Sequence, residues 1–432
     1  MSEKITNYVC PACMGSVHFA AEAGNIECDY CGSVYSVEEM EALMADQNAA
    51  AEEAAKKVDE WEVIQQEWIG EGMKAYTCPA CKAELICDET TAATSCPYCG
   101  NPTVVPGQFT GAAKPDYVIP FKLAKEAAVE KLQSHCKGKV LLPKSFTENN
   151  HLEEVKGIYV PFWLYDGVAK GAATYEATQK HTKTVGDEKI TTTEYYSVTR
   201  AGEAVFEKIP ADGSSKMPDD LMDSIEPYHY NEMKEFSKAY LTGYLADRYD
   251  VTAEESAPRI RERAKATLQS MLRETVTGYN SVEVVQSNTV ITEGKVSYAM
   301  MPVWLLSTKW NDQNFLFAMN GQTGKMVGDL PADKAKLWKI ILGVLLIAEI
   351  IMGLVTAFGS APLTFGAIAV KFVVIPLIAA VIVGFSLMGQ LKSVHKGSEA
   401  RNYMDKSKFN LTRNREYFVR RDVKREKIQK QQ

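Results

Sequence analysis

Eight of the ten cysteines in this chain fall into two sets that share one spacing. In each set a CxxC pair is followed, after fourteen residues, by a second CxxC pair and a glycine. Each pair offers two thiolates from one tight turn, and four thiolates form the tetrahedral shell that suits zinc. We therefore predict two Zn²⁺ ions, one held by each set, with these ligands: Cys10, Cys13, Cys28 and Cys31; Cys78, Cys81, Cys96 and Cys99.

A shell of four thiolates leaves no open coordination position, so we expect both metal sites to be structural and not hydrolytic. The matched spacing makes the two units an internal repeat, and a redox-active CxxC would not need two such pairs. Iron, in a rubredoxin-like site or a cluster, is the alternative occupant. Cys87 and Cys136 remain, and we interpret both as ordinary thiols.

Catalytic motifs are missing from the sequence, and we predict that the protein is not an enzyme. It contains no HExxH, GxSxG or strand-linked GxGxxG pattern. The segment Asn320-Gly321-Gln322-Thr323-Gly324-Lys325 lacks the first glycine of a phosphate-binding loop, and Met326 stands where a hydroxyl must reach magnesium. Asn-Gly between alternating apolar runs indicates a hairpin turn instead.

The cysteine sets need small hairpin units to position them, and we place these zinc ribbons at residues 1–35 and 76–105. Residues 36–75 between them are expected to form a helical linker, since Ser36 and Glu39 form a capping box. Its apolar residues recur at helical spacing on one side. That stripe either packs against its own chain or pairs with a partner's coiled coil.

Residues 112–331 are expected to form an α+β cytosolic domain. Helices are predicted over 122–136, 231–248 and 258–275, and a β-hairpin over 173–195 with its turn at 185–187. A Pro-x-Trp-Leu strand motif occurs at Pro161 and again at Pro302, which suggests two related halves. Trp163 and Trp304 in these motifs are either paired core anchors or a ligand surface.

Residues 337–389 predict a two-helix transmembrane hairpin. The runs 338–358 and 365–387 each hold roughly the ~20 apolar residues that cross a bilayer. Lysines flank both outer ends, so we expect a multi-pass protein of the cell membrane with both termini in the cytoplasm. A buried helix pair in a soluble domain is the alternative.

Two charged residues interrupt the hairpin, Glu349 in the first run and Lys371 in the second. Folding the hairpin at its turn brings them within about one helical turn, so an intramembrane charge pair is one interpretation. In the other, Lys371 extends to the membrane surface and Glu349 is protonated.

Charge is divided unevenly along the chain. Residues 390–432 form a basic tail, in which 391–432 hold thirteen Lys/Arg and five Asp/Glu; from the net −7, this leaves −15 on the remainder. The acidic remainder argues against a general nucleic-acid-binding surface. The tail would face anionic membrane lipid, or it only sets the topology. The polar start of the chain is unlike a signal peptide, so we expect the N-terminal part in the cytosol, where thiolates persist.

In its order of ribbon, helix, ribbon, Pro-x-Trp-Leu strand, NGQTGK hairpin and membrane hairpin, the chain resembles a Firmicutes family of membrane-anchored double zinc-ribbon proteins. Their ribbons are of the transcription-factor-IIB type and are often labelled primosomal-protein-N′-like or PriA-helicase-like. Some relatives resemble the membrane partners of phage-shock protein A homologues. The resemblance implies a docking platform in an envelope-stress response.

Two functions from different classes follow. The first is a membrane-anchored adaptor whose ribbons recruit a cytosolic protein, for which the resemblance suggests a phage-shock protein A-like partner. The alternative is a membrane-tethered nucleic-acid-binding protein that uses the ribbons and the basic tail, and its binding would weaken steeply with salt.

Overall fold

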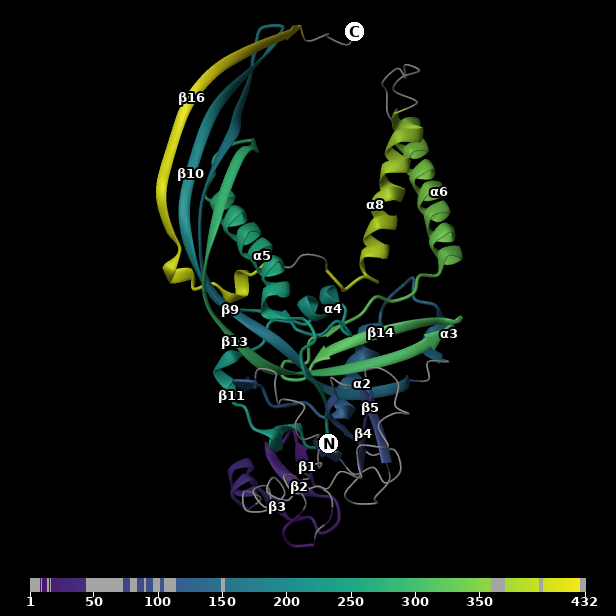
Figure 1. Ribbon diagram of the computed structural model, residues 1–432. Coiled ribbons are helices and arrows are strands. Elements are labelled where there is room, and N and C mark those ends of the chain that lie inside the picture. The colour runs from purple at the N-terminus through teal and green to yellow at the C-terminus, as the bar shows by residue number, and fades with distance from the viewer. Residues whose placement is uncertain are drawn as a thin grey trace.

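The computed structural model describes residues 8, 10–13, 15, 17–43, 73–77, 84–88, 91–95, 102–104, 114–148, 152–358, 370–395 and 399–427. A small N-terminal unit lies at one end of a central sheet, and a long arm of strands and a helical hairpin both rise from the opposite side (Figure 1).

The N-terminal unit is a three-stranded antiparallel sheet, made of β1 (Val17–Ala20), β2 (Asn25–Cys28) and β3 (Val34–Tyr35). A helix follows over 37–43. Its predicted capping box is present, since Glu39 N–H donates to Ser36 Oγ at 3.1 Å and Ser36 N–H donates to Glu39 Oε2 at 2.9 Å. The rest of the predicted helical linker, up to residue 72, lies outside the described residues.

The second cysteine unit is described only as strand backbone. Here β4 (Met73–Thr77) pairs with β5 (Glu84–Asp88), and β6 (Thr91–Ser95) pairs with β7 (Pro102–Val104). Strand β6 also pairs with β12 (Leu245–Asp247), so this unit is joined to the central sheet. Its four predicted ligands, Cys78, Cys81, Cys96 and Cys99, lie outside the described residues.

The central sheet contains two halves with the same order of strand, helix, strand and strand. The first half is β8 (Tyr117–Val118), α2 (Lys125–Cys136), β9 (Leu152–Val185) and β10 (Glu188–Asp212), with the short α3 (Lys144–Glu148) inserted before β9. The second half is β12, α5 (Ala253–Glu274), β13 (Ser281–Trp310) and β14 (Gln313–Asn320). The two-residue β15 (Met326–Val327) pairs with β14 across the Asn320-Gly321 turn.

These halves are related by an approximate two-fold axis between β9 and β13. Val160 pairs with Met301, its equivalent in the repeated motif, and the pair Leu245–Ile158 is repeated as Tyr117–Ala299. The Pro-x-Trp-Leu repeat therefore reflects a repeated arrangement of elements, in which each copy of the motif lies beside the other.

The predicted β-hairpin over 173–195 is the end of a much longer feature, the arm. It consists of the outer parts of β13, β9 and β10 together with β16 (Asn410–Lys427), in that order. Helix α5 packs on the arm near its base, on the side that faces the helical hairpin (Figure 1). The turn lies at Gly186, where φ is +60°.

The basic tail predicted over 390–432 contains a strand that the sequence analysis did not predict, because residues 410–427 pair with β10 from Glu203 to Glu188. Apolar residues such as Leu411 and Val423 break up the charged run and permit this extended pairing. The basic residues therefore lie along one edge of the arm.

The helix predicted over 231–248 is wrong. This segment contains the short 3₁₀ turns η2 (Tyr230–Glu232) and η3 (Lys238–Leu241). It also contains β11 (Lys234–Glu235), at one edge of the sheet, and β12, which lies between β9 and β6. Gly243 adopts φ +90°, which a helix does not allow. The helix predicted over 258–275 is confirmed as α5, which begins earlier, at a capping box formed by Thr252 and Glu255.

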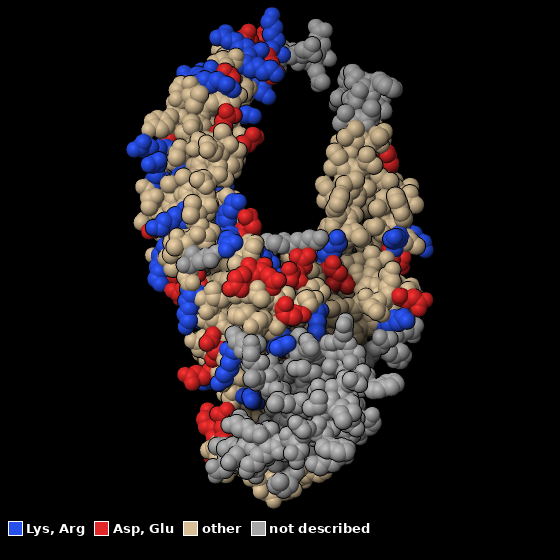
Figure 2. Space-filling view, in the orientation of Figure 1, with Lys and Arg blue, Asp and Glu red and all other residues tan. Residues whose placement is uncertain are grey.

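The hairpin consists of α6 (Lys334–Phe358), a π-helical turn η4 (Val370–Val374) and α8 (Ile375–Gly389). Two stretches, Lys334–Val355 and Phe372–Gly389, are long and apolar enough to cross a membrane. Large apolar side chains such as Leu346, Ile382 and Phe385 are more than half exposed. Figure 2 shows the hairpin as a largely uncharged surface with basic side chains gathered at its base.

Candidate metal centre

The four cysteines of the first set converge at one end of the N-terminal unit. Their Sγ atoms all lie within 4.8 Å of one another, with 3.5 Å between Cys10 and Cys31 and 3.5 Å between Cys13 and Cys28. A tetrahedral zinc ion with Zn–S bonds of about 2.3 Å separates its sulfur ligands by roughly 3.8 Å. The four residues therefore fit a tetrahedral metal ion, as the sequence predicted for this set.

Each CxxC pair is shaped by the same backbone turn. Cys10 N–H donates to the carbonyl of Gly15 at 2.9 Å, and Cys28 N–H donates to that of Ser33 at 3.0 Å. Gly32 adopts φ +69°, which glycine allows without strain. The glycine that follows the second CxxC pair is thus required by the turn that directs both thiols to one point.

Polar groups around the sulfurs lower the pKa of some of these thiols and raise that of others. Burial opposes ionisation of Cys10, but hydrogen bonds from the backbone of Cys13 and Ala12 lower the pKa of its thiol to about 6. At Cys13 the Gly15 amide favours ionisation, but the neighbouring Cys28 and Cys31 thiols outweigh it and raise the pKa to about 12. A metal cation bound among the four sulfurs would favour the thiolate forms, which are its ligands.

The N-terminal unit is fixed to the central sheet by contacts from β1. Phe19 N–H donates to the carbonyl of Thr242 at 3.0 Å, and Tyr244 donates its hydroxyl to the carbonyl of Phe19 at 3.4 Å. The Phe19 ring, only 2% exposed, packs edge-on against Tyr240 with 5.3 Å between ring centroids. A second link joins Glu41 to Ser237. These contacts hold the cysteine cluster in a set position on the domain.

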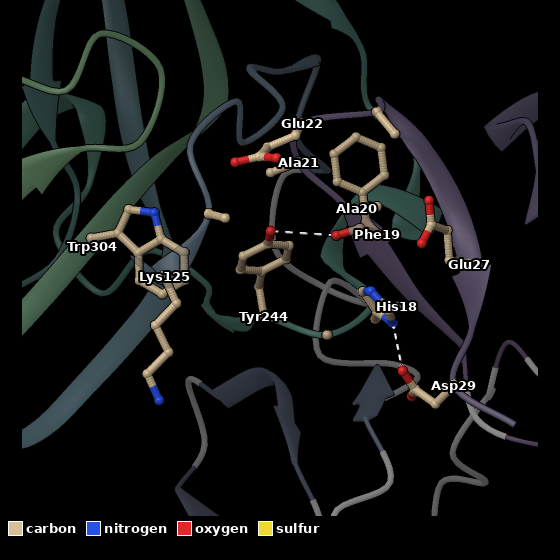
Figure 3. Close-up of a pocket in the computed structure, with 13 residues that line it drawn as sticks. His18, Phe19, Ala20, Ala21, Glu22, Glu27, Asp29, Lys125, Tyr244 and Trp304 are labelled. Atoms are coloured by element: carbon tan, nitrogen blue, oxygen red, sulfur yellow. Dashed lines mark hydrogen bonds and ion pairs between the residues drawn. The ribbon is translucent and has the colours of Figure 1, made fainter. Parts of the chain in front are cut away.

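A cleft of about 600 Å³ opens between the N-terminal unit and the domain. Figure 3 shows Trp304, Tyr244 and Lys125 on the domain side, facing Glu22 and the strands of the N-terminal unit. Its walls thus combine aromatic rings with carboxylates and one lysine.

The two repeated tryptophans are core anchors, the first of the two roles that the sequence analysis left open for them. Trp163 and Trp304 are 8% and 6% exposed. Each donates its indole N–H over 2.9 Å to a backbone carbonyl, that of Val251 and that of Leu123 respectively. These acceptors are themselves equivalent in the two halves, which extends the approximate symmetry to side chains. Trp304 alone also borders the cleft.

The structure does not test the charge pair predicted for the hairpin. Glu349 is exposed on α6. Lys371 lies in η4, and only its backbone is described. The charge pair therefore stays a prediction.

Sequence reasoning missed a buried group of charged residues beneath the segment that follows α8. It includes Arg259 and Arg263, one helical turn apart on α5, and three acidic residues, Asp212, Asp223 and Glu226. The available signal was the pair of arginines at i and i+4 on an otherwise apolar helix face, next to Ile260 and Ala264.

A protein of Bacillus subtilis (strain 168), the uncharacterized protein YdjG, is 33% identical to this chain over 332 residues. The match covers 77% of this chain and 92% of that protein. No family model matches the chain. No solved structure matches it either.

Proposed function

We propose that this chain, which belongs to the family of the Bacillus subtilis protein YdjG, is a membrane-anchored zinc-ribbon adaptor that recruits a cytosolic protein partner. In this proposal the hairpin crosses the membrane twice with both ends in the cytoplasm. Both cysteine sets hold structural Zn²⁺, and the protein carries out no reaction.

The observation that carries the proposal is the fixed position of a closed metal centre beside an open cleft. Four thiolates would fill the shell of the metal, so the centre supports structure and not catalysis. The contacts of Phe19 and Tyr244 hold the N-terminal unit against the domain and define one wall of the cleft. A partner segment bound in that cleft would contact both parts at once, so its binding would depend on the metal.

The hairpin supports membrane anchoring through its exposed apolar surface. The candidate spans contain 22 and 18 residues and are almost entirely unburied in the structure. Bilayer contact would remove this surface from water at roughly 25 cal/mol per Å². Lysines at the base of α6 and after α8 favour the cytoplasmic placement of both ends.

The arrangement of charge favours the adaptor over the nucleic-acid alternative. That alternative uses the ribbons together with the basic tail, but β16 lies on the arm, at the opposite end of the molecule from the N-terminal unit (Figure 1). Many of its cations are paired, for example Arg421 with Glu194 at 2.7 Å and Lys424 with Glu426 at 2.6 Å. A single nucleic-acid strand could not readily contact both features.

The test compares two cysteine variants of the full chain in native membranes. Cys28→Ser removes a predicted metal ligand, and Cys136→Ala removes a buried thiol on α2, outside the metal centre. Both variants should remain in the membrane fraction, but only Cys28→Ser should lose the co-purifying protein. Equal recruitment by both variants would mean that the first metal centre does not support partner binding.

A phage-shock protein A-like partner, and a place in the envelope-stress response, follow from the family resemblance and complete the proposal. The same purification tests this part, because such a partner is a coiled-coil protein that peptide mass spectrometry identifies directly. A partner without coiled-coil sequence would remove that part and leave the adaptor function itself in place.

A further inference from the structure

The segment that follows the second helix of the hairpin is fastened closely to the domain. We call residues 391–405 the strap; they connect α8 to the strand β16, and the structure describes 391–395 and 399–405. The strap donates three hydrogen bonds of 2.8 Å to the domain. Ser393 Oγ donates to the Gly328 carbonyl, His395 N–H to Ser224 Oγ, and Ala400 N–H to Thr267 Oγ1. Movement of α8 would therefore act directly on the domain.

The far end of the strap covers a buried part of the domain. Tyr403 is 5% exposed, and its ring lies 5.8 Å from that of Tyr230. The Asp405 N–H donates to the Val205 carbonyl on β10 at 3.3 Å. At the surface, Arg401 pairs with Glu274 at 2.7 Å. Tyr403 thus closes the strap over the residues beneath it, while the Arg401 pair remains in contact with water.

A cluster of charged side chains lies beneath Tyr403. Glu226, whose side chain is 5% exposed, accepts hydrogen bonds from both terminal nitrogens of Arg263, at 2.6 and 3.0 Å. Asp223 lies 3.4 Å from Arg263 and 3.6 Å from Arg259. Arg259 also pairs with Asp212 at 2.5 Å. The cluster joins α4 (Asp219–Ser224), α5 and β10 to the strap.

This cluster holds more carboxylates than cations. Its carboxylates are Asp212, Asp219, Asp223 and Glu226, and only Asp219 is exposed. Its cations are Arg259, Arg263 and Lys325. The Lys325 Nζ donates a hydrogen bond to the backbone carbonyl oxygen of Glu226. The half-buried Asp220 adds a further negative charge near Asp223. One buried carboxylate oxygen, Asp212 Oδ2, has no hydrogen-bond partner among the described residues. The cluster therefore has a place for one more positive charge, which a proton can supply.

We propose that this cluster is a proton-dependent latch, which binds one proton when the strap is closed and so couples the second hairpin helix more tightly to the domain as the surrounding pH falls. The latch is a property of the strap and the domain and does not depend on the adaptor function.

The buried carboxyl groups titrate in a range that makes the latch effective. Burial raises the pKa of Glu226 from 4.5 to about 7 and that of Asp212 from 3.8 to about 6. Burial also raises the pKa of Asp223. The tyrosines that face the cluster, Tyr228, Tyr230 and Tyr403, have pKa values raised far above their usual range by burial and stay neutral.

The sign of the effect follows from which state holds the proton. Opening the strap lets water reach Glu226 and returns its pKa toward 4.5, so an open strap releases the proton at neutral pH. Because the closed state binds more protons, opening becomes easier as the pH rises and harder as it falls. A group with a pKa of about 7 when closed and 4.5 when open shifts the opening equilibrium about tenfold between pH 8 and pH 6.

Hydrogen exchange of the full chain in lipid nanodiscs, measured at pH 6 and pH 8 and corrected for the intrinsic exchange rate, tests the latch. In the wild-type chain, strap peptides should open about tenfold less often at pH 6. Glu226→Gln mimics the protonated side chain, so its strap should lose most of the pH dependence and keep only the smaller part that Asp212 supplies. Glu274→Gln is the matched control, because it removes a carboxylate that contacts the strap but lies in water, and it should keep the pH dependence.

Equal strap protection of the wild-type chain at pH 6 and pH 8 would overturn the latch. So would a Glu226→Gln variant that keeps the wild-type pH dependence, or a Glu274→Gln variant that loses it. Should Glu226→Gln fail to fold, a pH titration of wild-type strap exchange decides the matter. A midpoint near 7 supports the latch, and a midpoint at 5 or below contradicts it.

Discussion

Removing one ligand of the first metal centre should unfold the N-terminal unit while the central domain remains folded. The described part of this unit has three short strands and one short helix over 37–43, and its small core includes Val17, Phe19 and Ile26. Structural zinc contributes roughly 10–16 kcal/mol to the folding of such small units. By comparison, truncating a buried phenylalanine costs about 3–5 kcal/mol. The metal is therefore the larger contribution, and folding of the unit should depend on it.

Two variants separate folding of this unit from its docking. Cys28→Ser should lower the zinc content by one ion per chain and expose residues 17–43 to protease. Phe19→Ala removes the ring that packs on Tyr240 and should loosen docking while the zinc content stays unchanged. Elemental analysis and limited proteolysis of the purified full chain measure both effects. A Cys28→Ser chain whose N-terminal unit keeps its protease resistance would refute the reasoning that metal binding folds it.

Three further predictions concern the domain and the hairpin. Trp163→Phe and Trp304→Phe each remove one indole hydrogen bond of 2.9 Å, so each should lower the free energy of unfolding by about 1–2 kcal/mol in urea titration; strongly unequal losses would count against the equivalence of the two halves. Asn320→Ala removes a fully buried amide that accepts hydrogen bonds from the Gln322 and Thr323 N–H groups, at 2.9 Å each, and donates to two carbonyls. We expect the free energy of unfolding to fall by about 2–4 kcal/mol, and a smaller loss would mean that water replaces the amide. Leu346→Arg places a charge in the middle of α6, which costs about 3 kcal/mol in a bilayer, so alkaline extraction should release more of this variant from membranes. Val290→Arg, at a similarly exposed position on the arm, is the control and should be extracted like the wild-type chain. Equal extraction of both variants would argue against a membrane-spanning α6.

The convergence of the first four cysteines could be predicted from sequence because it is a local arrangement. The spacing from Cys10 to Cys31 fixes two tight turns and one short hairpin, and each turn is closed by its own backbone hydrogen bond. Helix α5 was predictable for the same reason, since its capping box and its periodicity lie within one segment. The hairpin follows from composition alone, because exposed apolar length needs no tertiary contact to be recognised.

The features that depend on distant pairing could not be predicted in this way. Strand β16 pairs with β10 across more than 200 residues, and nothing in the charged run 410–427 indicates a sheet partner. Residues 231–248 have apolar residues at helical spacing, but Ala246 and Asp247 pair with β6, and Tyr240 packs on Phe19. The latch cluster needs α4, α5, β10 and the strap together, so only the folded chain reveals it.

The central claim, a membrane-anchored adaptor, is tested most directly by purifying the wild-type chain from native membranes in mild detergent. Co-purifying protein and the ratio of nucleic-acid to protein absorbance are both read from the same sample. The adaptor account predicts a stoichiometric cytosolic protein without nucleic acid. Bound nucleic acid that dissociates as salt is raised, with no protein partner, would contradict it and support the membrane-tethered nucleic-acid-binding alternative.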